Sequence, residues 1–208
     1  MLALAFMLVV ITAQSRQSFA LTKPVKAISS FAVPSSTSKP PNMSHDLFRF
    51  DSASAVAPWM ATDDRVMGGV SQSLMRFDGA GHAVFEGMMS LDNNGGFASV
   101  RARVKPTPIT LPAEYVLTVR GDGKRYKLNL RTEGQFDAVS YQASFDTEVD
   151  TWMTVRIPVS AFRPSFRGRQ VNAPPLDPSK VAETGLMIAE KQAGRFQLHL
   201  QSIVVATP

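Results

Sequence analysis

From Phe48 to the C-terminus, short segments in which apolar and polar residues alternate follow one another between turn signals. No window of a dozen residues carries an apolar stripe at helical spacing. Because a period of two places apolar side chains on one face of a strand, the pattern predicts strands throughout. Roughly eight or nine strands at intervals of about 10 to 15 residues fit an all-β, jelly-roll-like antiparallel β-sandwich. The clearest segments are 82–91, 96–104, 115–119, 126–130, 140–145, 152–159, 185–189 and 194–205.

Two details of the pattern make sharper predictions. Asp122-Gly123 lies between segments 115–119 and 126–130 and can supply the positive dihedral angles of a tight turn, so we predict a β-hairpin there. In the last segment the apolar residues change from even positions, up to Leu200, to odd positions from Ile203 onward. This change of face predicts a bulge or a bend between sheets.

Charge divides the chain near residue 42. The chain of 208 residues has a net charge of +5, but residues 1–42 hold four basic residues and no acid, which leaves residues 43–208 nearly neutral. We predict a β-sandwich domain over 43–208 and, over 1–42, a segment outside the fold. The domain lacks the sustained basic face that nucleic-acid binding requires, so nucleic acid is not an expected partner.

The N-terminal segment has three possible interpretations. Leu2–Ile11 is apolar but far shorter than the roughly 20 residues of a membrane-spanning helix, so we predict no integral span. Followed by Ser18-Phe19-Ala20, it is typical of a secretory signal and of an exported or periplasmic protein. The acid-free, serine-rich composition also suits an organelle transit peptide, mitochondrial in a eukaryote. The Pro/Ser-rich stretch 27–42 fits a disordered linker, with translation beginning at Met43 in the cytoplasm.

The stretch 63–73, DDRVMGGVSQS, concentrates polar chemistry. It lacks the spacing and the lysine of a phosphate-binding loop. Asp63 and Asp64 are adjacent, and neighbours on a strand point to opposite faces, so they can share one metal ion only if the chain turns there. A loop acid that pairs with Arg65 or caps a turn is the favoured interpretation.

Other signals of catalysis or metal binding are weak. The chain has no cysteine, its three histidines form no short-spaced cluster, and no G-x-S-x-G elbow is present. Residues 92–96 form an Asn/Gly turn rather than a calcium loop, because the glutamate of that loop is missing. We therefore predict no catalytic residue, no metal site and no cofactor. A hydrolase that uses Asp63 and Asp64 as paired acids is the less favoured alternative.

Residues 163–180 form the longest stretch without a strand pattern, and Arg163, Arg167 and Arg169 precede its first acid. Long structureless loops in compact domains are often functional, but a solvated crossover between two sheets fits equally well. Arginines there would suit carboxylates on a partner protein.

Several motifs in order resemble the complex I intermediate-associated protein family. They are Trp59 with DDRVMGGVSQS, NNGGFASVR (93–101), LTVRGDGKRYKLNLRT (117–132), Trp152, FRPSFRGR (162–169) and GLMIAEKQAGRFQLHLQSI (185–203). The resemblance runs from about Phe48 to Val205. It implies a galactose-binding-like β-sandwich, a protein-binding role and no established catalytic residues. The family's named eukaryotic member is a mitochondrial chaperone that helps assemble NADH:ubiquinone oxidoreductase, and this chain is shorter than that factor.

Two functions of different classes follow. The favoured hypothesis is a non-enzymatic assembly chaperone that binds a client protein, with complex I subunits or intermediates as the expected clients and Phe97, Phe162 and Phe166 as anchors beside arginines. The alternative is a carbohydrate-binding module, for which only Trp59, Trp152, Tyr115, Tyr126 and Tyr141 could stack on sugars. The hypothetical binding residues at the rim and in the loop are Trp59, Asp63, Asp64, Arg65, Asn93, Asn94, Phe97, Arg101, Phe166, Arg167 and Arg169.

Overall fold

A computed structural model describes residues 43–109, 111–132 and 138–207. Within these ranges the chain forms strands and short 3-10 helices but no α-helix, as the alternating pattern predicts. No helix in the described ranges is long and apolar enough to cross a membrane. The strands are β1 (Ser44–Arg49), β2 (Met60–Ala61), β3 (Gln72–Phe77), β4 (Ala83–Met89), β5 (Ala98–Arg103), β6 (Glu114–Arg120), β7 (Arg125–Arg131), β8 (Ser140–Asp146), β9 (Trp152–Pro158), β10 (Arg163–Phe166), β11 (Arg169–Gln170), β12 (Glu183–Ile188) and β13 (Gly194–Ala206). The 3-10 helices are η1 (Ala53–Ala55), η2 (Asp64–Met67), η3 (Asp92–Asn94), η4 (Val159–Ala161) and η5 (Pro178–Lys180).

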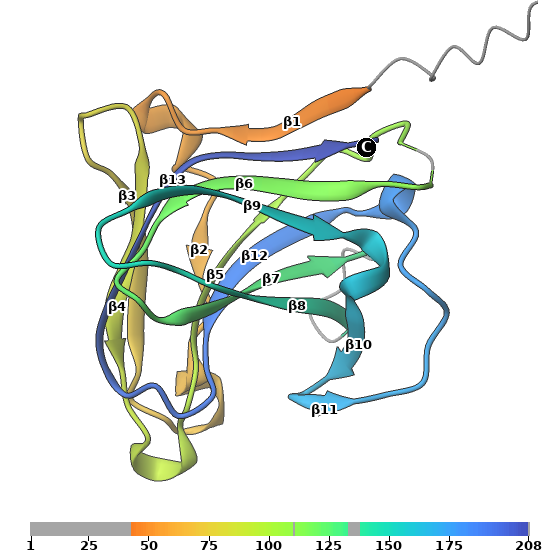
Figure 1. The fold of residues 1–208 in the computed structure, drawn as a ribbon. Coiled ribbons are helices and arrows are strands. Elements are labelled where there is room, and N and C mark those ends of the chain that lie inside the picture. The colour runs from red at the N-terminus through yellow and green to blue at the C-terminus, as the bar shows by residue number, and fades with distance from the viewer. Residues whose placement is uncertain (1–42, 110, 133–137, 208) are drawn as a thin grey trace, which may run out of the picture. The chain divides into compact units, whose positions relative to one another are not determined.

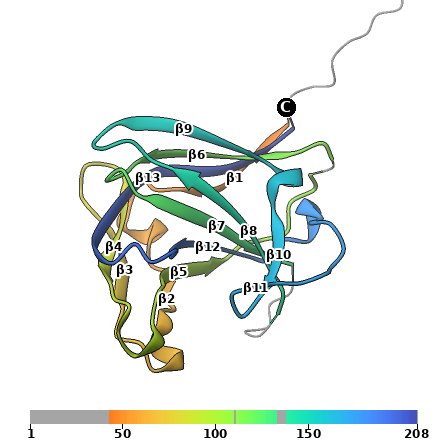
Figure 2. The same cartoon turned by 60° about the horizontal axis from the view of Figure 1, so that its bottom comes forward.

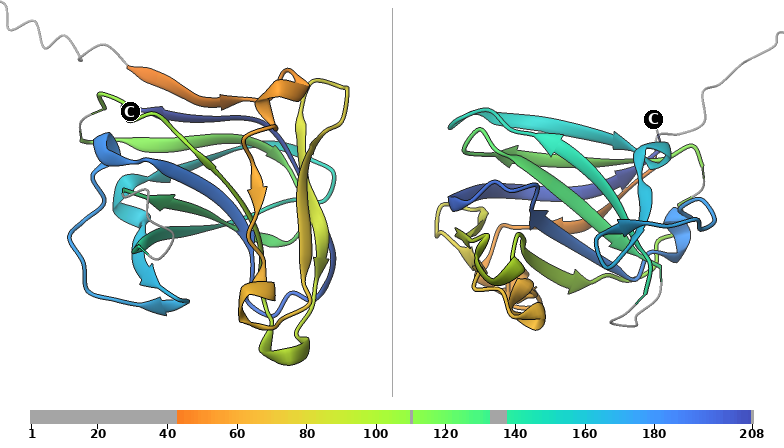
Figure 3. Two further views of the ribbon diagram at one scale, coloured as in Figure 1. Left: turned by 180° about the vertical axis from the view of Figure 1, so that it is seen from behind. Right: turned by 90° about the horizontal axis from the view of Figure 1, so that it is seen from below.

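The strands form two antiparallel sheets that pack face to face (Figure 1). The six-stranded sheet has the order β3-β4-β13-β6-β9, with β1 paired to β13. The seven-stranded sheet has the order β11-β10-β8-β7-β12-β5-β2. In Figure 1, β6 and β9 of the six-stranded sheet lie above β7 and β8 of the seven-stranded sheet, and Figure 3, left, shows the two layers from behind, with β1 above β12. The predicted all-β antiparallel sandwich is confirmed.

The core lies between the sheets and follows from the alternation. Tyr115, Leu117 and Val119 of β6 are fully buried, and so are Leu128 and Leu130 of β7. Side chains of the two sheets meet there, and burial of the apolar area stabilises the sandwich.

The predicted hairpin over 115–130 is wrong. β6 pairs with β9 and β13 in one sheet, whereas β7 pairs with β8 and β12 in the other. The turn at Asp122-Gly123 therefore carries the chain from one sheet to the other. The alternation of apolar residues predicts which side chains of a strand face the core, but it does not predict which strand pairs with it. β6 and β7 each face the core from a different sheet, so both show the alternation without pairing with each other.

The change of face in β13 is confirmed as a bulge. The pairing of β13 with β6 shifts register between Leu200 and Ser202. On its other side, β13 pairs with β4 before this point and with β1 after it. The extra residue bends the strand, so both halves keep their apolar side chains in the core.

The segment 163–180 is more regular than predicted. Its first eight residues form the β10–β11 hairpin at the edge of the seven-stranded sheet, and η5 lies near its end. Of the strands outside the clearest segments of the sequence, β1, β2, β3 and β11 lie at edges or ends of the two sheets, and β10 lies between β11 and β8. Residues 1–42 lie outside the described ranges, so the three interpretations of that segment and the domain boundary near residue 42 stay predictions.

Candidate functional site

A groove of about 740 Å³ lies on the outer face of the seven-stranded sheet. Its floor is formed by β5, β12, β7 and β8, and two walls rise from it. One wall comes from residues around η2 and from Gly96-Phe97, and the other is the β10–β11 hairpin. Figure 2 turns this sheet toward the viewer, with β10 and β11 beside one edge and β2 and β5 at the other.

The floor is set by strand register. Arg101, Gly185, Asn129 and Gln142 lie side by side across β5, β12, β7 and β8. A Cβ atom on Gly185 would lie 2.8 Å from the carbonyl oxygen of Val100, so glycine is required there and keeps the middle of the floor low. Asn129 Oδ1 is buried and accepts no hydrogen bond from the described residues, so it is an unused acceptor in the floor.

Charges of both signs line the floor. The Glu183 carboxylate, whose side chain is 15% exposed, lies 3.5 Å from Arg101 Nη1 and 3.3 Å from Arg131 Nη1. Lys127 Nζ lies 2.9 Å from Glu190 Oε1 at the other end of the groove. Such a floor offers both cations and carboxylates to a polar ligand.

The walls are apolar with a charged edge. Met67 and Phe97 lie on one wall, and Met67 is 61% exposed. On the other wall the Arg167 guanidinium lies 5.2 Å from the centre of the Phe166 ring. Arg167 and Gly168 both have positive φ angles, which form the two-residue turn between β10 and β11. The hairpin thereby presents an aromatic ring and an arginine to the groove.

Asp64 holds the first wall in place. Its side chain is fully buried and accepts hydrogen bonds from Ser71 N (2.9 Å), Ser71 Oγ (2.6 Å), Gly96 N (2.7 Å) and Phe97 N (3.4 Å). Burial by itself raises the pKa of Asp64, but the hydrogen bonds from Ser71, Gly96 and Phe97 together lower it below its ordinary value. One carboxylate therefore connects the segment after η2 to the segment before β5.

Asp63 makes a second connection. It is 8% exposed and accepts hydrogen bonds from Ser73 N (3.0 Å), Ser73 Oγ (2.6 Å) and Ser99 N (3.0 Å). These bonds fix β3 to β5. The two adjacent carboxylates point to different sets of donors, so they act as supports of the wall and do not converge on one point.

The candidate residues predicted from the sequence separate into three groups. Those that line the groove are Phe97, Arg101, Phe166 and Arg167. Those that are buried are Asp63, Asp64 and Trp59. The Trp59 ring packs against Phe48 and Phe50 in the core. Those that are exposed but do not line the groove are Arg65, Asn93, Asn94 and Arg169.

Phe162 is not an anchor, because it is 5% exposed and packs on Tyr115. The floor residues Lys127, Asn129, Arg131, Gln142 and Glu183 were missed by the sequence reasoning. The polar positions that alternate with core positions in β7, β8 and β12 were their only signal.

Aromatic residues suited to sugar stacking are not in the groove. Tyr115 and Tyr126 are fully buried, Tyr141 is 6% exposed, and Trp152 lies on the other sheet. The aromatic side chains that line the groove in the described ranges are Phe97 and Phe166.

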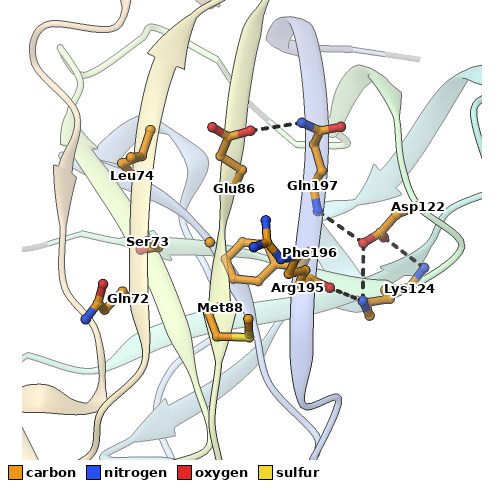
Figure 4. Close-up of a pocket in the computed structure, with 11 residues that line it drawn as sticks. Gln72, Ser73, Leu74, Glu86, Met88, Asp122, Lys124, Arg195, Phe196 and Gln197 are labelled. Atoms are coloured by element: carbon orange, nitrogen blue, oxygen red, sulfur yellow. Dashed lines mark hydrogen bonds and ion pairs between the residues drawn. The ribbon is translucent and has the colours of Figure 1, made fainter.

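A second hollow of about 750 Å³ lies on the outer face of the six-stranded sheet (Figure 4). Both of its carboxylates already accept several hydrogen bonds. Glu86 accepts hydrogen bonds from Arg76 and Gln197, and Asp122 accepts them from Gln197 N, Lys124 N and Tyr126 Oη. The groove, with its two walls and its unpaired Asn129 acceptor, is therefore the better candidate site.

Solved structures show the same fold. A family 11 carbohydrate-binding module from Clostridium thermocellum, bound to a β-1,3-1,4-mixed-linked tetrasaccharide, matches with a TM-score of 0.57 at 15% identity and covers 78% of this chain and 94% of its own. An agarase matches with a TM-score of 0.53 at 10% identity, over 79% of this chain and 25% of its own. At such identities the similarity shows the galactose-binding-like fold alone.

Sequence relatives are more informative about the family. A Drosophila melanogaster protein named Complex I intermediate-associated protein 30, mitochondrial, is 27% identical over 76% of this chain and 61% of its own length. The Mus musculus protein of that name is 25% identical over 72% and 52%. An uncharacterised Schizosaccharomyces pombe protein is 31% identical over 69% and 75%. The chain thus spans about half to three fifths of the two named relatives. The sequence profile for Complex I intermediate-associated protein 30 matches residues 48–200, and the chain belongs to that family.

Proposed function

We propose that this protein is a non-catalytic binding protein that assists the assembly of respiratory complex I, and that the groove on its seven-stranded sheet holds a segment of a client polypeptide. The single observation that carries the proposal is a walled groove, in a member of this family, whose lining mixes charges, a buried acceptor and apolar anchors. The names of the Drosophila and mouse relatives support complex I as the setting.

The lining matches the chemistry of an extended polypeptide. Asn129 Oδ1 on the floor can accept a backbone N–H, and the paired charges of Lys127 and Glu190 can exchange partners with client side chains. Phe97 and Phe166 on opposite walls can hold apolar side chains of the client, which is the kind of contact that dominates binding energy at interfaces.

The proposal is tested by affinity capture from mitochondria or membranes of the native host, followed by mass spectrometry. Arg167→Ala removes a side chain that lines the groove, while Arg169→Ala, two residues away in the same hairpin, removes an exposed arginine that does not. We expect wild type and Arg169→Ala to capture complex I subunits, and Arg167→Ala to capture several-fold less at an unchanged melting temperature. Equal capture by the two variants would refute the role of the groove.

The carbohydrate-binding alternative predicts a different result. Sugar binding on such sandwiches relies on aromatic stacking, and no tryptophan or tyrosine among the described residues lines the groove. Retention on a mixed-linked β-glucan column that Arg167→Ala abolishes, together with no capture of complex I subunits, would replace the assembly proposal with this one.

A further inference from the structure

A cluster of metal-ligand side chains lies on the six-stranded sheet, away from the groove. Asp78 directly follows β3 and His82 directly precedes β4, so the turn between these strands brings the two together. His199 lies on β13, opposite Val84 of β4. The pairing of β13 with β4 thus joins side chains that are 117 residues apart, which spacing along the sequence cannot reveal.

The three side chains converge on one point. His82 Nε2 lies 2.5 Å from Asp78 Oδ2 and 2.8 Å from His199 Nδ1, and the three ligand atoms all lie within 4.8 Å of one another. His82 is 7% exposed, and the Asp78 side chain is 17% exposed. His199 is partly buried, so the cluster is partly shielded from bulk water.

Counting hydrogens shows that these contacts are not all satisfied. Arg120 Nη2 lies 3.3 Å from His199 Nδ1 and can only donate, so Nδ1 of the neutral ring serves as an acceptor. The carboxylate of Asp78 is also an acceptor. His82 Nε2 carries one hydrogen at most, and if Asp78 accepts it, no hydrogen is left for the 2.8 Å contact with His199 Nδ1. A divalent cation in place of that hydrogen would use all three lone pairs at once.

We propose that Asp78, His82 and His199 bind a divalent transition-metal cation of the zinc class, with water completing the coordination. Two imidazole nitrogens and one carboxylate oxygen suit zinc or copper better than magnesium or calcium, which prefer oxygen ligands. In tetrahedral zinc sites with bonds of about 2.0–2.1 Å the ligand atoms lie about 3.3 Å apart, so the two histidine nitrogens need to separate by about half an ångström and the Asp78 oxygen needs to move about 0.8 Å from His82 Nε2.

Neighbouring residues shape the site in opposite ways. The Trp152 ring meets the His82 ring edge to face at 5.4 Å and limits the orientations available to that ring. Arg120 lies over the same tryptophan, 5.3 Å from its centre, and its Nε has no hydrogen-bond partner in the described part of the chain. Because the arginine carries positive charge, it opposes a bound cation and must move away from His199.

The experiment uses the untagged full chain, freed of metal by chelator dialysis and titrated with Co²⁺. We expect one equivalent of Co²⁺ to give the visible absorption of a tetrahedral site and Zn²⁺ to displace it. Asp78→Asn and His199→Gln should each weaken binding by more than the roughly 10–100-fold that loss of a supporting residue costs. If His199→Gln fails to fold, Asp78→Asn still tests the proposed site.

Three further variants make the assignment specific. His45→Gln, which removes the third histidine of the chain, should leave binding unchanged. Arg120→Gln should tighten it several-fold by removing the opposing charge. Trp152→Phe should remove most of the quenching of tryptophan fluorescence by Co²⁺, because only Trp59 remains, while the visible absorption persists. No saturable uptake at millimolar ion, or uptake lost in His45→Gln and kept in His199→Gln, would overturn the proposal.

Discussion

Asp64→Asn is the most informative test of how the wall of the groove is held. The substitution keeps the size of the side chain but replaces one carboxylate oxygen with an NH₂ group. That group would face Ser71 Oγ, Gly96 N and Phe97 N if it takes the place of Oδ2. Two backbone N–H donors would lose a charged acceptor, and Ser71 Oγ would have to turn.

The magnitude follows from these contacts. A hydrogen bond to a charged group contributes about 1.5–3 kcal/mol, so the loss of the two backbone contacts, one of them long, should lower the free energy of unfolding by about 3–5 kcal/mol. That is a large fraction of the roughly 5–15 kcal/mol of a typical domain, and corresponds to about 10 °C or more in melting temperature. Asp92→Asn, at an exposed acid in the adjacent η3, should change stability by no more than about 0.5 kcal/mol.

The effect should depend on pH with a defined sign. Because the folded state lowers the pKa of Asp64, its contribution is fully present above the pKa of the unfolded chain and is lost as pH falls through the lower folded value. The stability difference between wild type and Asp64→Asn should therefore be constant near neutral pH and shrink below about pH 4. The assay is urea unfolding followed by fluorescence across this range. A variant as stable as wild type at pH 7, or a difference that grows in acid, would refute the assignment.

The remaining predictions concern the backbone near this support and the crossing between sheets. Gly69→Ala should destabilise far more than Gly68→Ala in thermal unfolding, because a Cβ on Gly69 would lie 2.4 Å from Asp64 Cγ. A Cβ on Gly68 would meet open space, so Gly68→Ala should cost only the roughly 1–2 kcal/mol of an alanine at a φ of +93°. Equal losses would mean that the packing around Asp64 is not tight. Asp122→Ala should cost about 2–4 kcal/mol, since it removes the acceptor for Gln197 N and Tyr126 Oη at the turn between sheets. A loss below about 0.5 kcal/mol would contradict that role, as a surface substitution has no larger effect.

The sequence predicts the layers better than the connections. Alternation identifies the central strands because each buries every second side chain, as in Tyr126, Leu128 and Leu130 of β7. It cannot show that β6 and β7 belong to different sheets, because the same side chains would be buried whether or not the two strands paired with each other. Short edge strands such as β2 and β11 escape notice because two residues make no pattern.

The candidate site is only partly readable from the sequence for the same reason. Phe97, Arg101, Phe166 and Arg167 stand out as aromatic and basic residues in or beside turns, and the structure brings them to one groove. Asp63 and Asp64 stand out equally, yet their carboxylates accept hydrogen bonds from backbone donors of distant segments. Only the folded chain shows which of these conspicuous residues line the groove and which support its wall.

In the proposed function, the client polypeptide binds the outer face of the seven-stranded sheet. A photo-crosslinking residue placed at Gln142, on the floor of the groove, tests it most directly in the native host, with the same residue at exposed Arg195 on the six-stranded sheet as control. We expect crosslinks from position 142 to complex I subunits or assembly intermediates and few from position 195. Crosslinks to those proteins from position 195 alone would contradict it.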